Sequence, residues 1–146
     1  MNKNALKKRW KKFQTTEEIL SETKNLQVSP FGKTEANLQD FRGLTLWTSE
    51  LSSGGGWHNE PHSINLRQSD FSFSTWKGFD ISKSIITDSR FEGAELIGDI
   101  RFYSTKIENC LFENCLFKNF NFTKSSLINV SFFGLRPRDK FSFSAD

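Results

Sequence analysis

The amino-acid sequence repeats itself at a five-residue step along about half of its length. The stretch "ENCLFENCLFKNFNF", from Glu108 to Phe122, contains nearly the same five-residue unit three times. An amphipathic helix places apolar residues three or four positions apart, and a half-buried strand places them two apart, so neither explains a step of five. The repeat therefore indicates a backbone that changes direction every five residues, and it decides the fold before single helices and strands are assigned.

Each unit of five contains one apolar centre and one mostly small residue two positions earlier. The centres are Leu66, Phe71, Trp76, Ile81, Ile86, Phe91 and Leu96, then, after one extra residue near Gly98 and Asp99, Phe102, Ile107, Phe112, Phe117, Phe122, Leu127 and Phe132. The second set is Ile64, Ser69, Ser74, Phe79, Ser84, Ser89, Ala94, Ile100, Thr105, Cys110, Cys115, Phe120, Ser125 and Val130. All fourteen centres are apolar, although hydrophobic residues make up 36% of the chain, and we predict that both sets face inwards.

This order of a small residue, a polar residue, Leu or Phe and two further polar or glycine residues resembles the pentapeptide-repeat family. The units "SDFSF", "SRFEG", "AELIG" and "CLFEN" fit the pattern, and the resemblance covers residues 64–134. It implies an all-β solenoid, a right-handed quadrilateral β-helix in which each unit forms one side and four units form one coil. We expect about four coils with an N-terminal α-helical cap.

Four sides of five residues place centres about twenty positions apart above one another. The predicted columns are Phe71, Phe91, Phe112 and Phe132; Leu66, Ile86, Ile107 and Leu127; Trp76, Leu96 and Phe117; and Ile81, Phe102 and Phe122. The bulky exceptions in the small set, Phe79, Ile100 and Phe120, all fall on the fourth side, which supports a common register. Glycine, asparagine and aspartate recur two positions after the centres, where we expect the corners.

The chain divides into three predicted parts. Residues 1–35 form a basic amphipathic helix, with Leu6, Trp10 and Phe13 on one face, and a linker. This part is expected to cover the open end of the solenoid, and the six bases of residues 1–13 leave membrane-surface or nucleic-acid binding as alternatives. Residues 36–134 form the repeat, which Phe41, Leu46 and Leu51 open with an imperfect coil, and residues 135–146 form a tail that caps the other end or frays.

A loop insertion is predicted at residues 52–63, "SSGGGWHNEPHS", because three glycines and a proline interrupt the register. His58, Glu60 and His62 have spacings that could hold a metal, but a glycine-rich loop with two histidines is more often only a loop, and we expect no metal. Trp57 either packs against the rod or is offered to a partner.

Composition limits the class of protein. The 146 residues are enough for one domain, and no apolar run is long enough to cross a bilayer. The N-terminus lacks the apolar core of a secretory signal, and two cysteines, Cys110 and Cys115, suggest neither zinc nor a disulfide framework. We therefore expect a cytoplasmic protein in which both cysteines are small interior fillers, with no membrane partner.

The sequence offers no recognisable catalytic motif and no cofactor site. A convex rod has no cleft in which to perturb titratable groups, so we expect no enzyme and no small-molecule substrate. Protection of DNA gyrase by DNA mimicry, which the bacterial members of the family are known for, needs an acidic surface. Residues 63–134 carry eight acids and eight bases, so this function, like nucleic-acid binding through the basic N-terminus, remains an alternative.

The leading prediction is therefore a non-catalytic module that binds, and inhibits, a protein partner. Its most concrete form is an immunity protein that neutralises a toxin. More outward positions are apolar than solubility requires: Ile85, Ile97, Tyr103, Leu111, Leu116, Ile128 and Phe133. Ile97, Leu111 and Leu116 are expected near one corner, and the predicted partner-binding residues are Ile97, Tyr103, Leu111, Leu116 and Trp57. The N-terminal segment or a second copy of the chain, as monomer or homodimer, could cover this patch instead.

Overall fold

The protein is mostly β, with few helices. The computed structural model describes residues 2–47, 65–77, 80–97, 100–117, 120–122, 124–134, 136–137 and 141–142. Two α-helices, α1 (Lys3–Lys8) and α2 (Thr16–Glu22), flank a 3₁₀ helix at Arg9–Lys12. The described strands are β1 (Gln39–Asp40), β2 (Thr45–Trp47), β3 (Asn65–Arg67), β4 (Ser69–Asp70), β5 (Thr75–Lys77), β6 (Asp80–Ser82), β7 (Ile85–Thr87), β8 (Glu95–Ile97), β9 (Ile100–Tyr103), β10 (Lys106–Glu113), β11 (Leu116–Phe117), β12 (Phe120–Asn121), β13 (Ser126–Phe133), β14 (Arg136–Pro137) and β15 (Phe141–Ser142).

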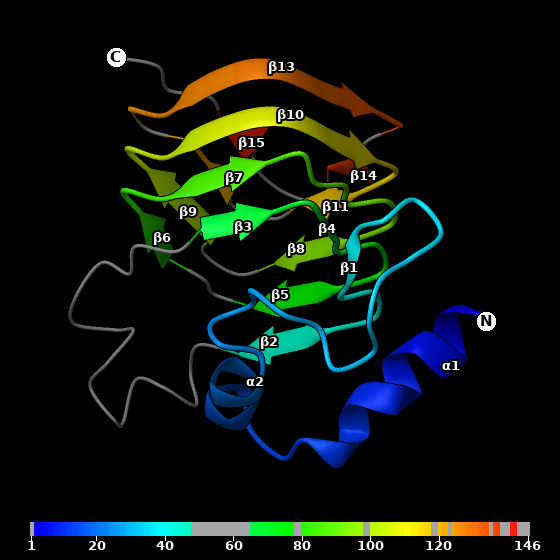
Figure 1. Ribbon diagram of the computed structural model, residues 1–146. Coiled ribbons are helices and arrows are strands. Elements are labelled where there is room, and N and C mark those ends of the chain that lie inside the picture. Colours follow the sequence, from blue (N-terminus) through cyan, green and yellow to red (C-terminus); the bar gives the residue numbers. More distant parts are fainter. Residues whose placement is uncertain are drawn as a thin grey trace.

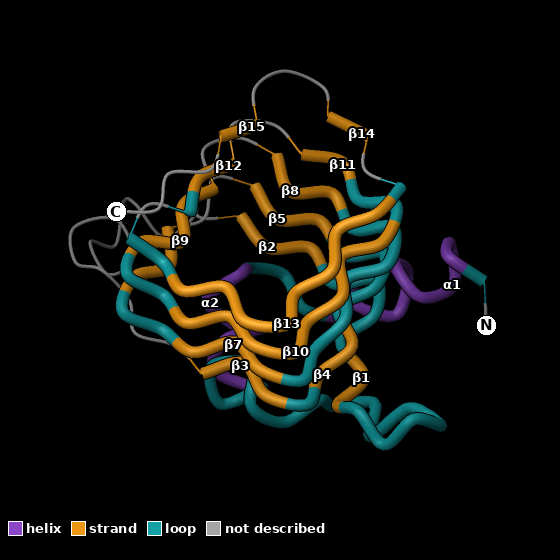
Figure 2. Tube along the Cα trace, turned by 90° about the horizontal axis from the view of Figure 1, so that it is seen from above, coloured by secondary structure: helices purple, strands orange, loops and turns teal. Residues whose placement is uncertain are grey.

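The strands form parallel sheets whose members come from successive passes of the chain. The orders are β3-β7-β10-β13, β2-β5-β8-β11-β14 and β6-β9-β12-β15, with a separate pair β1-β4. The chain visits these sheets in turn and returns to each one coil later (Figure 1), and Figure 2 looks along the stack from the β13 end, where strands of successive coils lie over one another. This order is consistent with a β-helix solenoid, in which each side of one coil pairs with the same side of the next.

The strand registers confirm the predicted columns. Thr75 lies opposite Glu95 and Ile107 lies opposite Leu127, both at a separation of twenty residues. The separation is still twenty between Lys77 and Ile97, but it is twenty-one between Asp80 and Arg101. The single extra residue therefore enters between Ile97 and Arg101, where the sequence predicted it.

The stack begins earlier and extends further than the repeat itself suggests. Thr45–Trp47 pairs with Thr75–Lys77, which confirms an opening coil before the predicted loop, although Leu51 and the loop at 52–63 lie outside the described residues. At the other end Arg136–Pro137 pairs with β11 and Phe141–Ser142 pairs with β12. The described part of the tail thus adds strands instead of fraying, and the sheet from β2 to β14 has five levels where about four were expected.

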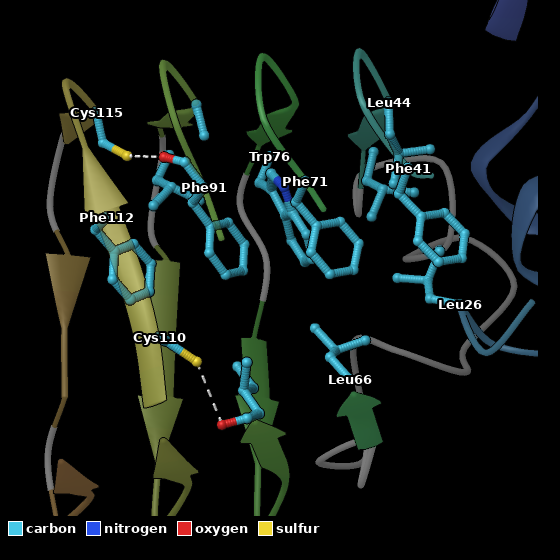
Figure 3. Packing of buried hydrophobic residues seen from close by; sticks show 14 of the residues in the cluster. Leu26, Phe41, Leu44, Leu66, Phe71, Trp76, Phe91, Cys110, Phe112 and Cys115 are labelled. Carbon is cyan, nitrogen blue, oxygen red and sulfur yellow. Dashed lines mark hydrogen bonds between the residues drawn. The ribbon is translucent and has the colours of Figure 1, made fainter. Parts of the chain in front are cut away.

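A column of phenylalanine rings forms the centre of the core (Figure 3). Ring centroids are 5.2 Å apart for Phe41 and Phe71, 5.2 Å for Phe71 and Phe91, 4.7 Å for Phe91 and Phe112, and 4.9 Å for Phe112 and Phe132. The planes within each pair lie within 17° of parallel. Stacked parallel strands impose this arrangement, because identical positions of neighbouring coils point in the same direction.

Most of the described small inward positions are buried as predicted, whereas Ser125 and Val130 are partly buried. The Ser89 hydroxyl donates to the carbonyl oxygen of Thr87 at 2.9 Å, so burial leaves no unpaired polar group there. Cys115 Sγ donates to the Phe91 carbonyl oxygen at 2.6 Å, and Cys110 Sγ lies 3.5 Å from the Ile86 carbonyl oxygen (Figure 3). Both cysteines are free thiols that fill the interior.

Corners of the coils have left-handed backbone conformations. Residues two positions after the centres with positive φ are Gln68, Phe73, Lys83, Asp88, Gly93, Ser104, Asn109, Asn114, Lys124, Asn129 and Gly134. Glycine, asparagine and aspartate were expected at these places. Gln68, Lys83, Ser104, Lys124 and Phe73 are not of these types, and Phe73, with φ of 60°, is the bulkiest of them. A Cβ added at Gly93 would lie 2.9 Å from the Phe73 ring. The regular step of the coils therefore sets the corner conformation even for a bulky residue.

The N-terminal segment lies at the β2 end of the stack, opposite β13 (Figure 1). The prediction of one helix through the first twenty residues was wrong, because Phe13 is extended and Thr15 begins a second helix. Thr15 Oγ1 accepts a hydrogen bond from the Glu18 amide, and the Glu18 carboxylate accepts one from the Gln14 amide, an arrangement that starts a helix. Four buried apolar residues of this segment belong to the main core; they are Trp10, Ile19, Leu20 and Leu26.

Candidate protein-interaction surfaces

The predicted partner-binding residues that the structure describes lie on more than one side of the stack. Leu116 of β11 lies opposite Glu95 of β8, so Ile97, two residues further along β8, faces outwards from the same sheet. Leu111 pairs with Ser131 and Arg90 and lies on the adjacent side, before the corner at Asn114. All three leucine and isoleucine side chains are half-buried. Ile97 and Leu116 therefore share one sheet, and Leu111 lies on the adjacent side, across the corner at Asn114.

Two predicted residues cannot be placed as side chains. The backbone of Tyr103, in β9, lies opposite Ser82 of β6, but its side chain is not among those described. Trp57 lies outside the described residues, as do His58, Glu60 and His62. Within the described part of the chain, no group of three or more His, Cys, Asp or Glu residues could hold a metal.

The most exposed large apolar side chains of the repeat lie on its last long strand. Ile128 is 48% exposed and Phe133 is 52% exposed, and both belong to β13. Both residues are among the outward apolar positions predicted from the sequence, but they are not among the predicted partner-binding residues, which are Ile97, Tyr103, Leu111, Leu116 and Trp57. The position of β13 in the last full coil of the repeat was the signal that could have ranked them higher, because a side chain at an end has a neighbouring coil on one side only.

Charges of both signs lie next to one another on the outer faces. The column before the phenylalanine centres contains two buried acids, Asp40 and Asp70, and then Arg90, whose Nη2 contacts Glu92 Oε2 at 3.0 Å. Lys106 and Glu108 form another exposed pair at 3.7 Å. Exposed pairs of this kind add little to stability, but they give the described surface a mixed character instead of a continuous acidic one.

A buried ion-pair network attaches the N-terminal segment to the first coil. Arg9 Nη2 donates to Asp40 Oδ1 at 2.6 Å, and Arg42 Nε donates to the same oxygen at 2.9 Å. The Asp40 side chain is only 6% exposed. Burial by itself would raise the pKa of Asp40, but the hydrogen bonds from Arg42 and Arg9 outweigh it and hold that pKa well below its usual range.

This network makes stability depend on pH in the acid range. Above the ordinary aspartate pKa of about 3.9, Asp40 is charged in the folded and unfolded chains, and its full contribution is present. As the pH falls below that value, the unfolded chain binds a proton first, so the contribution declines towards the lower folded pKa. We expect Asp40→Asn to lower the free energy of unfolding by about 2 kcal/mol at pH 7. Urea unfolding of both proteins should show this difference shrinking below about pH 4; a difference that stays constant down to pH 2 would contradict the assignment.

Trp10 provides the second attachment. Its indole Nε1 donates to the Arg42 carbonyl oxygen at 2.8 Å, and its ring stacks on Phe41 with centroids 6.2 Å apart. Phe31 meets the Trp10 ring edge-on at 4.8 Å, and the Arg9 guanidinium lies 4.1 Å from the Phe31 ring centroid. Trp10 thereby covers the end of the phenylalanine column, while Lys3, Lys8, Lys11 and Lys12 remain exposed.

Two of the open pockets are lined by described residues, and neither of these two has a catalytic arrangement. One, of about 360 Å³, lies between the N-terminal segment and β2 and includes Trp10, Lys11 and Thr45. The other, of about 450 Å³, includes Arg42, Asp70 and Arg90. Burial raises the pKa of the Cys110 thiol to about 11, which keeps it protonated and unreactive near neutral pH. No helix of the described residues is long and apolar enough to span a membrane.

Comparisons with known proteins assign no family to this chain. No family model matches the chain. No curated protein matches it. Among solved structures, the chain is similar to the crystal structure of a pentapeptide repeat protein, Rfr23, from the cyanobacterium Cyanothece 51142, at 14% identity over 73% of this chain and 88% of that chain, with a TM-score of 0.28. Because this TM-score is low, the description of the fold rests on the strand registers and ring columns given above.

Proposed function

We propose that this chain is a pentapeptide-repeat protein with a right-handed quadrilateral β-helix, and that it binds and inhibits a protein partner without catalysis. The observation that carries the proposal is that Ile97 and Leu116 lie on one outer sheet surface, where Leu116 is opposite Glu95 and Ile97 is opposite Lys77. Half-buried apolar residues on a regular sheet fit a partner's apolar side chains at little entropic cost, because the strands beneath are already ordered.

The proposal takes its most concrete form as an immunity protein that occupies a toxin. A rod that needs no conformational change can block a partner by contact alone, and its mixed charges can match an equally mixed partner surface. DNA mimicry is a weaker alternative, since opposite charges lie side by side on the described faces. Nucleic-acid binding by the basic N-terminus is weaker as well, because Arg9 is engaged by Asp40.

The test measures binding of the purified chain to the product of the adjacent reading frame by calorimetry. Leu116→Asp should weaken binding at least tenfold, since it replaces one of the two apolar side chains of this sheet surface by a charged one. Thr87→Asp, an outward change on β7 in a different sheet, is the matched control and should leave the affinity unchanged. Equal affinities of the native chain and Leu116→Asp would contradict the assignment of this surface, provided that circular dichroism shows both proteins to be folded.

A further inference from the structure

A pocket lies where the N-terminal segment bends between its 3₁₀ helix and α2, at the β2 end of the stack (Figure 1). The bend occurs at Phe13, whose backbone is extended. Trp10 lines the pocket from one arm of the bend and Ile19 lines it from the other, while Thr45 of β2 lies between them and the stack. The pocket, of about 360 Å³, therefore has aromatic and aliphatic walls.

Two lysines without an ion pair lie at this pocket. Residues 2–13 contain six bases and no acid. Arg9 is held by Asp40, whereas Lys7 and Lys11, which line the pocket, take part in none of the ion pairs among the described residues. Two positive charges beside an apolar pocket favour an occupant that carries carboxylates next to an apolar group.

The open shape of the pocket limits the kind of occupant. A binding pocket for a free small molecule surrounds most of the ligand, but this pocket is open to solvent. It can enclose one side chain of a peptide whose remaining residues continue over the surface. The three acids of α2, Glu17, Glu18 and Glu22, do not line the pocket, so an acidic peptide is attracted along the lysines of α1 and the 3₁₀ helix instead.

We propose that this pocket binds an acidic peptide segment of a protein partner, with one aromatic side chain in the pocket and carboxylates beside Lys7 and Lys11. An aromatic side chain suits the walls, because the rings of Trp10 and Phe13, whose centroids are 5.7 Å apart, offer faces and edges for ring contacts. Trp10 is already fixed by its hydrogen bond and its ring contacts, so binding orders little of the protein.

Fluorescence anisotropy of a synthetic peptide tests the pocket. The probe is a fluorescein-labelled peptide with one central phenylalanine between two glutamates on each side. It should bind the full chain in low salt and approach saturation below about 1 mM. Replacing its phenylalanine by glycine should weaken binding at least tenfold, because the pocket is then left empty. Replacing its glutamates by lysines should abolish binding, since like charges then face each other.

Matched protein variants test the two lysines. Lys7→Glu combined with Lys11→Glu should raise the Kd of the probe at least tenfold without changing the circular dichroism spectrum, because neither side chain is fully buried. The control is Lys24→Glu combined with Lys33→Glu, which changes the net charge equally at exposed positions outside the pocket. The control variant should bind the probe like the native chain.

Three results would overturn the proposal. They are the absence of binding up to about 1 mM, equal affinity for the phenylalanine and glycine peptides, and equal effects of the two lysine pairs. The inference goes beyond the proposed function, since Ile97 and Leu116 do not line the pocket. Leu116→Asp should therefore bind the probe like the native chain, and a loss in this variant would assign the peptide to the other surface.

Discussion

Replacing Phe112 by alanine is expected to lower the free energy of unfolding by about 3–5 kcal/mol. The ring is fully buried between Phe91 and Phe132, with centroids 4.7 Å and 4.9 Å away. Its neighbours cannot collapse into the cavity, because backbone hydrogen bonds between coils fix their spacing. Urea unfolding followed by tryptophan fluorescence measures the change.

The matched control is Phe133→Ala, which changes the residue that follows Phe132 on β13. Phe133 is 52% exposed and faces outwards, so its replacement should change the unfolding free energy of the monomer by less than about 1 kcal/mol. Measurement at low protein concentration keeps any association between chains from contributing to the measured free energy. Similar losses for Phe112→Ala and Phe133→Ala would show that the inward and outward assignment of the repeat is incorrect.

Trp10→Ala should cost about 3–5 kcal/mol as well. The side chain is 4% exposed and covers the first ring of the column, Phe41. Its loss leaves the Arg42 carbonyl oxygen without the indole donor and uncovers Phe31. Because these contacts hold the N-terminal segment, limited proteolysis should also cleave before Thr15 faster in the variant.

A conservative variant separates the two contributions of Trp10. Trp10→Phe keeps a ring on Phe41 but cannot donate to Arg42, so it should lose only about 1 kcal/mol. Lys11→Ala, an exposed change on the same segment, should lose less than that. If Trp10→Ala behaves like Lys11→Ala, the segment does not close the end of the stack.

The repeat could be predicted from the sequence because each of its units meets the same physical demand. An apolar centre at every fifth position needs an interior, and corners need residues that tolerate positive φ. Even the extra residue between Ile97 and Arg101 could be predicted, because one added residue shifts the positions of all later centres by one. Periodicity could not predict Phe73 at a corner, because its conformation follows from the coils on either side.

The ends of the stack were harder to predict, since their contacts occur once. Nothing periodic connects Arg9 with Asp40, thirty-one residues away. The break between the two N-terminal helices did leave a signal, the Thr15 and Glu18 pair of a helix start, which the apolar spacing of Leu6, Trp10 and Phe13 concealed. The paired strands of the tail left none, because Pro137 argues against a strand in any sequence taken alone.

The candidate surface was predictable only in part for a related reason. Alternation along each strand identifies which side chains face outwards, and Ile97, Leu111 and Leu116 do so. The degree of exposure depends on what lies above and below each residue in the stack. Ile128 is therefore more exposed than Leu116, although both occupy outward positions of the repeat.

Nuclear Overhauser contacts between aromatic rings test the coiled architecture most directly. Selectively labelled phenylalanine should give strong contacts between Phe91 and Phe112, whose ring centroids are 4.7 Å apart although twenty-one residues separate them. The pairs Phe71 with Phe91 and Phe112 with Phe132 should give the same result. Contacts confined to residues three or four positions apart through this region would indicate helices and would contradict the account.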